Sequence, residues 1–120
     1  MAAAADSVDS LLAAMVERLN AQLPAKIDRN TRLDSVKAGP NRTVTYYYTI
    51  TTHELSALNV QKLRASLIPA SRSHLCTSAN TRAFLDADVV YTYHYSDRNG
   101  EFVTSFETSR ADCKEYGDRT

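Results

Sequence analysis

The most informative feature of this 120-residue sequence is how little it has of several residue types. It contains only three glycines, and it has neither a glycine-rich phosphate-binding loop nor a G-x-S-x-G nucleophile elbow. No apolar run approaches the ~20 residues that a membrane-spanning helix needs. Lysine plus arginine and aspartate plus glutamate each total 14, and this zero net charge removes the basic excess that nucleic-acid binding requires. We therefore expect no nucleic-acid partner, no membrane insertion and no cofactor.

The chain has two cysteines, Cys76 and Cys113, and they lie far apart in the sequence. They form no C-x-x-C motif, which excludes a zinc ribbon or a thioredoxin-type redox site. Neither lies in a strongly apolar run, so a disulfide is favoured over two buried thiols. The bridge would close a loop of nearly forty residues and stabilise the fold by about 4 kcal/mol in the chain-entropy model. Because disulfides persist in oxidising compartments, we expect a periplasmic or secreted protein.

Length predicts one domain, which we place at residues 6–116. Residues 1–5 have neither a basic region nor a long apolar region, so they are not a complete signal peptide. They are expected to be disordered, either as the remnant of a cleavage site in an exported chain or as an ordinary native terminus. Residues 117–120 are expected to form a disordered tail.

Helical periodicity appears in three segments. Apolar side chains recur at helical spacing over residues 8–19, which predicts an amphipathic helix. This stripe is expected to pack in the core, with a face for a partner helix as the alternative. Residues 55–68 suggest a second helix that Pro69 breaks, and residues 78–85 suggest a shorter third helix.

Four segments are predicted to be strands. Residues 31–37 alternate weakly, whereas residues 43–51 are dense in β-branched and aromatic side chains. Residues 89–97 and 101–108 form a predicted hairpin around Asn99-Gly100, because both turn positions of an Asn-Gly hairpin favour positive φ. The predicted fold is α+β, with an antiparallel sheet of about four strands and the N-terminal helix and one or two further helices packed on one face.

Alternation assigns the strand residues to two faces of this sheet. The apolar face is expected to carry Val44, Tyr46, Tyr48, Ile50, Tyr91, Tyr93, Tyr95, Phe102 and Phe106. The polar face would remain free for a partner, and its candidate binding residues are Tyr47, His94, Thr45, Thr49 and Thr92.

No catalytic or metal-binding pattern emerges. The three histidines, His53, His74 and His94, do not occur at ligand spacing, so no metal site is expected. With no nucleophile elbow and no phosphate loop, we expect a binding protein rather than an enzyme.

Several segments together look like a recurring pattern, and we quote them as they stand: Gln22-Leu23-Pro24, Asp28-x-x-Thr31-Arg32-Leu33-Asp34-Ser35-Val36, Ala38-Gly39-Pro40, the Thr- and Tyr-rich strand at 43–51, Cys76-Thr77, Arg82-x-Phe84-Leu85, the Tyr-x-Tyr-x-Tyr strand, Asp97-Arg98-Asn99-Gly100 and Asp112-Cys113. On these segments the chain resembles a group of small exported bacterial proteins of unassigned activity, over about residues 18–113. By analogy of size and compartment, the resemblance implies an immunity-type inhibitor that neutralises a protein toxin or effector by stoichiometric binding. The alternative is a cell-envelope accessory domain that binds a small molecule or an envelope component. A homodimer is also left open.

Overall fold

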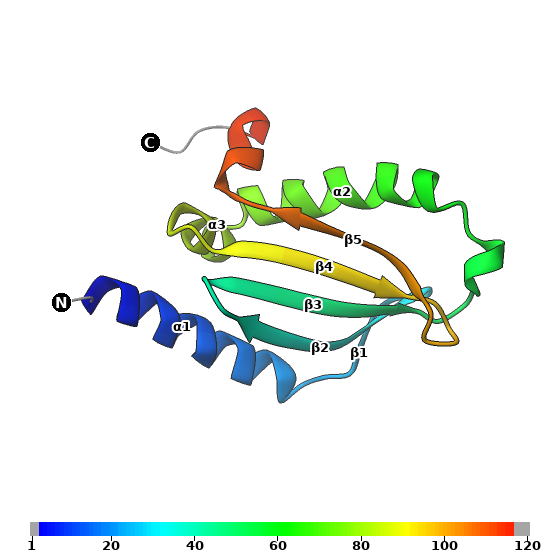
Figure 1. Cartoon of the computed structure of the whole chain (residues 1–120), viewed down its shortest axis with the longest axis horizontal. Coiled ribbons are helices and arrows are strands. Elements are labelled where there is room, and N and C mark those ends of the chain that lie inside the picture. The colour runs from blue at the N-terminus through cyan, green and yellow to red at the C-terminus, as the bar shows by residue number, and fades with distance from the viewer. Residues whose placement is uncertain (1–2, 117–120) are drawn as a thin grey trace.

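The computed structural model describes residues 3–116, with side chains from Val8 onward. Helix α1 begins at Ala3 and therefore includes residues 3–5, which we expected to lie outside the domain. The predicted tail at 117–120 lies outside the described residues. The elements, shown in Figure 1, are α1 (Ala3–Asn20), β1 (Ala25–Asp28), β2 (Thr31–Gly39), β3 (Thr43–Ile50), η1 (Leu55–Ala57), α2 (Val60–Thr77), α3 (Ala79–Asp86), β4 (Val90–Ser96), β5 (Phe102–Thr108) and η2 (Arg110–Tyr116).

The five strands form one mixed sheet in the order β1-β2-β3-β4-β5. The predicted α+β class is confirmed, but the prediction of an antiparallel sheet is wrong for the central pair, because β3 and β4 are parallel. Helices α2 and α3 carry the chain back along the sheet, so that β4 enters beside β3 in the same direction. Strand β1 was missed because it has only four residues, mostly exposed, and the alternation of Ala25 and Ile27 with Lys26 and Asp28 is too short to indicate a strand.

Helix α2 continues through Pro69, so the prediction that this proline breaks the helix is wrong. A proline inside a helix removes one hydrogen bond and costs about 3 kcal/mol. Apolar residues on both sides of it, including Leu67 and Leu75, contact the same core. Burial of both halves against one surface offsets the cost, and this contribution is invisible in the local sequence.

The β4–β5 hairpin closes through a longer loop than predicted. The Asp97 N–H donates to the Glu101 carbonyl at 2.8 Å, and the Gly100 N–H donates to the Asp97 carbonyl at 3.0 Å. Three residues therefore form the loop instead of two. Gly100 has a positive φ of 85°, but Asn99 does not, so the prediction of two positive φ angles is wrong.

A bulge next to Ser96 changes which hairpin side chains face the core. Tyr93 pairs with Phe106 as predicted, but beyond the bulge Ser96 pairs with Phe102. Phe102 therefore joins the polar face, where it is 55% exposed, and Val103 turns into the core. The predicted placement of Phe102 on the apolar face is wrong because one extra residue inverts the alternation that follows it.

The side chain of Asp97 holds this loop from the inside and is almost fully buried. One carboxylate oxygen accepts the N–H groups of Asn99 and Glu101, and the other accepts that of Leu55, each at 2.8 Å. Burial by itself would raise the pKa of this carboxyl. The three backbone donors and the Arg98 charge outweigh burial and lower the pKa below its ordinary value.

Replacing Asp97 with asparagine is expected to lower the melting temperature at neutral pH and much less in acid. A carboxyl whose pKa falls on folding contributes stability that is present above its unfolded value near 3.8 and is lost as the pH falls through the folded value. Melting curves of wild type and variant at pH 7 and at pH 3 measure this. The exposed Glu107→Gln is the matched control. An equal drop in melting temperature for Asp97→Asn at both pH values would contradict the lowered pKa of Asp97.

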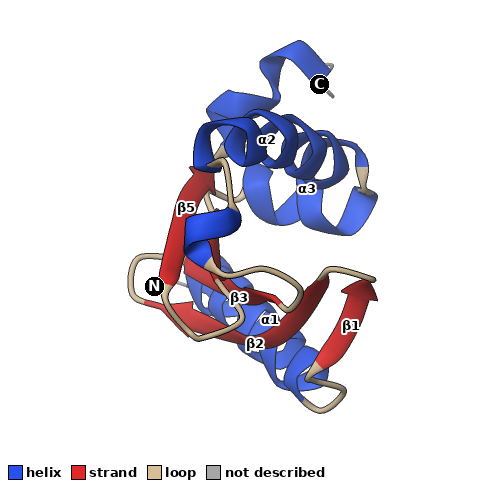
Figure 2. Ribbon diagram, turned by 90° about the vertical axis from the view of Figure 1, so that its right-hand side faces the viewer, coloured by secondary structure: helices blue, strands red, loops and turns tan. Residues whose placement is uncertain are grey.

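Helices α1, α2 and α3 all cover the face of the sheet that carries the tyrosines. In Figure 1, α1 runs along the β2 side and α2 along the β5 side, and Figure 2 shows α2 and α3 side by side. The opposite face carries the predicted polar residues. The buried hydrophobic core comprises Leu12, Leu33, Val36, Val44, Ile50, Leu75, Cys76, Leu85, Val89, Tyr91, Tyr93, Tyr95, Val103, Phe106 and Cys113.

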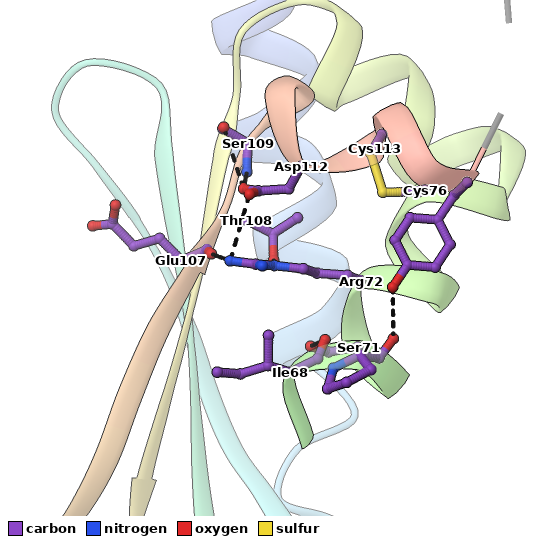
Figure 3. A network of polar contacts seen from close by, with 11 residues as sticks. Ile68, Ser71, Arg72, Cys76, Glu107, Thr108, Ser109, Asp112 and Cys113 are labelled. Carbon is purple, nitrogen blue, oxygen red and sulfur yellow. Dashed lines mark hydrogen bonds and ion pairs between the residues drawn. A yellow bond between two sulfur atoms is a disulfide. The ribbon is translucent and has the colours of Figure 1, made fainter. Parts of the chain in front are cut away.

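The predicted disulfide between Cys76 and Cys113 is confirmed, and it joins the last turn of α2 to η2 (Figure 3). Both cysteines are fully buried. Beside the bridge, the Arg72 guanidinium donates to the Glu107 carbonyl at 2.9 Å and lies 3.6 Å from a carboxylate oxygen of Asp112 (Figure 3). The C-terminal η2 is thus tied to both α2 and β5.

Candidate binding surfaces

The open face of the sheet places two predicted binding residues in contact. Tyr47 on β3 lies opposite His94 on β4, and their ring centroids are 5.2 Å apart. The His94 ring is also 5.2 Å from that of Phe102 on β5. We call Tyr47, His94 and Phe102 the aromatic row. At its other end, the Lys37 ammonium lies 5.5 Å from the centroid of the Tyr47 ring, within cation–π range.

The three predicted threonines surround the aromatic row. Thr45 and Thr92 pair across β3 and β4 and are half-buried. Thr49 donates its hydroxyl to the Asp34 carboxylate, so its hydrogen-bonding capacity is partly used within the sheet. Phe102 was not among the predicted binding residues, because only the bulge brings it to this face. A role for this surface in binding remains a prediction.

Replacing Tyr47 with alanine is expected to weaken partner binding by ~1–3 kcal/mol with little change in melting temperature, if the aromatic row is an interface. The reason is that Tyr47 lies on the open face, away from the core. Titration calorimetry with a verified partner, together with melting curves, measures both effects. Ser105→Ala, on the exposed part of the same face, is the matched control. Unchanged affinity for Tyr47→Ala would move the interface elsewhere.

A second recess lies on the helical side, between α1 and α3. It has a volume of about 550 Å³ and a mainly apolar lining. We call it the α1–α3 groove. Its lining residues are Val8, Leu11, Met15, Arg18, Leu19, Tyr46, Asn80, Thr81, Ala83, Phe84 and Ala87.

The apolar stripe of α1 was expected to pack in the core, and the structure buries it only in part. Leu12 is 3% exposed, whereas Leu11 is 61% exposed. Val8, Met15 and Leu19 are half-buried at the wall of the groove. The periodicity of the stripe predicts that one face of the helix is apolar, but it does not distinguish a core contact from a free one.

The floor of the groove belongs to a cluster of neutral tyrosines. The Tyr46 ring lies 5.4 Å from that of Tyr93 and 6.0 Å from that of Tyr91. Burial raises the pKa of Tyr46, Tyr48, Tyr91, Tyr93 and Tyr95 above the ordinary value of 10, because a phenolate loses its hydration there. The stability that these neutral rings contribute is present below pH 10 and falls above it. At neutral pH these tyrosines are therefore un-ionised and act through packing.

Within residues 3–116, no cluster of three or more histidine, cysteine or acidic side chains could hold a metal ion. In the same part of the chain, no helix combines the length and the apolar character needed to cross a membrane.

Fold and surfaces together define a small α+β domain with a covered tyrosine-rich face, an open aromatic row and an apolar groove. The chain belongs to the protein family described as Domain of unknown function (DUF8479), which matches residues 7–103. Comparison with curated proteins finds no match.

Solved structures share the fold over nearly the whole chain. The pilotin EpsS of the Vibrio vulnificus type 2 secretion system has a TM-score of 0.73 at 19% identity, covering 90% of this chain and 93% of that chain. A Pseudomonas aeruginosa protein described as secreted has a TM-score of 0.73 at 12% identity, with coverage of 89% and 93%. The type II secretion pilotin AspS of Vibrio cholerae has a TM-score of 0.69 at 16% identity, with coverage of 90% and 94%.

These neighbours correct the interpretation of the resemblance. The prediction of a small exported bacterial protein is compatible with them. The prediction of an immunity-type inhibitor that neutralises a toxin was wrong, because two of the similar structures are secretion pilotins. That interpretation depended on size and compartment alone, and neither property specifies a partner. The expected periplasmic or secreted location agrees with the disulfide and with these neighbours.

Proposed function

We propose that this chain is an exported accessory protein of the cell envelope that binds a protein partner and catalyses no reaction. The α1–α3 groove is the proposed contact site. The observation that carries the proposal is the groove itself, where apolar side chains of two helices line an open recess above neutral tyrosines. Recesses of this kind receive apolar side chains of a partner.

Two further observations support the proposal. The fold is similar over nine tenths of the chain to that of two pilotins of type 2 secretion systems, which are accessory proteins of an envelope machine. The groove is also bounded by Leu11, one of three large hydrophobic residues that are strongly exposed in the described part of the chain. Exposed apolar area rimmed by polar residues is typical of interaction sites, including protein contacts.

Site-specific cross-linking tests the proposal. The photoreactive amino acid p-benzoylphenylalanine would replace Leu11 at the groove or, as a control, Ile27 on β1. The two positions are matched in exposure, at 61% and 54%. Irradiation in the native envelope should join one protein to position 11 and not to position 27, and mass spectrometry identifies it.

The identified protein is then purified and its affinity is measured. Leu11→Asp should weaken binding about tenfold or more, because it places a charge in an apolar contact. Ile27→Asp should leave binding unchanged. Equal cross-linking at both positions, or equal effects of the two substitutions, would contradict the groove as the contact site. A chain that turns over a substrate would contradict the non-catalytic role.

A further inference from the structure

The β2–β3 loop lies between the two helices that form the walls of the groove. Asn41 and Arg42 both adopt positive φ, at 60° and 58°. Neither residue is glycine, so both have a left-handed backbone conformation that costs free energy and that the surrounding structure must stabilise. Two residues before Asn41, a Cβ added at Gly39 would lie 2.6 Å from the Thr43 hydroxyl oxygen, so the Thr43 side chain would have to move.

This conformation directs the Arg42 side chain to both walls at once. Its guanidinium donates to the Ala87 carbonyl at the end of α3, at 2.8 Å. Its Nε lies 3.5 Å from the Asp9 carboxylate on α1. The Arg42 carbonyl also accepts the N–H of Val90, at 3.0 Å, so β4 fixes the loop from below. Ala87 lines the groove directly, and Asp9 adjoins Val8, which also does.

At its other end, α1 is fixed to the sheet. The Asn20 amide nitrogen donates to the Val36 carbonyl at 2.7 Å, and its oxygen accepts the Val36 N–H at 2.9 Å. Between these two ends, the groove separates α1 from α3. Among the side chains that the structure describes, Asp9 connects the N-terminal half of α1 to Arg42 through an ion pair, whereas Asn20 at the C-terminal end makes two neutral hydrogen bonds.

From these contacts we infer that Arg42 is a positioning residue for the groove, and that its ion pair with Asp9 is a salt-sensitive tie that holds α1 at a fixed distance from α3. Only the expected effect of the tie on partner binding rests on the proposed function. The Asp9 side chain is 60% exposed and that of Arg42 is 27% exposed, so dissolved salt can screen the pair. Opening of the tie would widen the groove at the Val8 end.

Hydrogen exchange of the intact chain tests the tie without a partner. Asp9→Ala should make the amides of the first half of the described α1 exchange about two- to fivefold faster, as expected for a lost exposed ion pair. The same change should occur in wild type when sodium chloride is raised to ~0.5 M, and salt should add nothing in Asp9→Ala. Exchange near Asn20 should not change.

Arg110→Ala is the matched control. Arg110 also bonds to the end of α3, donating to the Asp86 carbonyl at 3.3 Å and lying 3.2 Å from the Asp88 carboxylate, and neither of these contacts involves α1. Arg42→Ala and Arg110→Ala should both lower the melting temperature, and only Arg42→Ala should release α1. Release of α1 by Arg110→Ala, or no release by Asp9→Ala, would overturn the inference.

A binding measurement separates this inference from the proposed function. If Leu11→Asp abolishes binding of the cross-linked partner, Asp9→Ala should change the affinity at low salt and not at ~0.5 M. An unchanged affinity at low salt would overturn the positioning role. If Leu11→Asp has no effect, the proposed contact site fails, and the exchange experiment still decides whether the tie exists.

Discussion

Replacing Tyr93 with alanine is expected to lower the free energy of unfolding by about 3–5 kcal/mol, the range for removal of a large buried aromatic side chain. Tyr93 lies at the centre of the core and is 8% exposed. Its ring centroid is 5.4 Å from those of both Tyr46 and Tyr48 and 5.7 Å from that of Phe106. The variant therefore loses contacts with β3 and β5 at once and leaves a cavity that neighbouring rings cannot fill.

Urea unfolding of the wild type and of both tyrosine variants measures this loss. Tyr47→Ala is the control, because Tyr47 is the next residue along β3 from Tyr46 but points to the open face. Its loss should be much smaller. A loss of similar size in both variants would mean that the two faces of the sheet contribute equally to stability, and the distinction between core and binding face would be wrong.

Replacing both cysteines with alanine is expected to lower the free energy of unfolding by about 4 kcal/mol in the chain-entropy model. The bridge links residues that are 37 apart in sequence, and it restricts the unfolded chain over this loop. Intact mass measured without reductant should be lower by two hydrogens than the mass after reduction. Two free thiols in the native protein would contradict the bridge and weaken the inference of export.

The double cysteine variant also distinguishes the contribution of the disulfide from that of the polar contacts beside it. Arg72 bonds to β5 and lies near Asp112, so η2 retains a polar attachment after the bridge is removed (Figure 3). We expect protease resistance of η2 to be lost in the cysteine variant and only reduced in Arg72→Met. If Arg72→Met alone releases η2, the polar contacts, and not the disulfide, hold the C-terminal segment.

Local chemistry was sufficient to predict much of this fold. Helical spacing located α1, β-branched and aromatic density located β3, and alternation assigned the tyrosines of β4 to the buried face. The pairing of Cys76 with Cys113 followed from there being only two cysteines. These features depend on residues near one another in sequence, or on a choice with few alternatives.

The groove could not be predicted in the same way. The stripe on α1 indicates that one face of the helix is apolar, but the fraction of that face that contacts the sheet depends on where α3 lies. The position of α3 depends in turn on α2 continuing past Pro69 and on the Arg42 contact with Ala87. The Arg42 contact joins residues distant in sequence, and α2 continues past Pro69 because both of its halves contact the core.

Periodicity and residue chemistry act locally, and they were enough to predict the class of fold, the disulfide and the apolar strand faces except at Phe102. The parallel pairing of β3 with β4 and the outward placement of Phe102 are visible in the folded structure alone. The same holds for the separation of α1 from α3 over Tyr46. Burial and hydrogen bonding over the whole chain select the strand partners, the position of the bulge and the spacing of the two helices. These features therefore cannot be derived from any short segment.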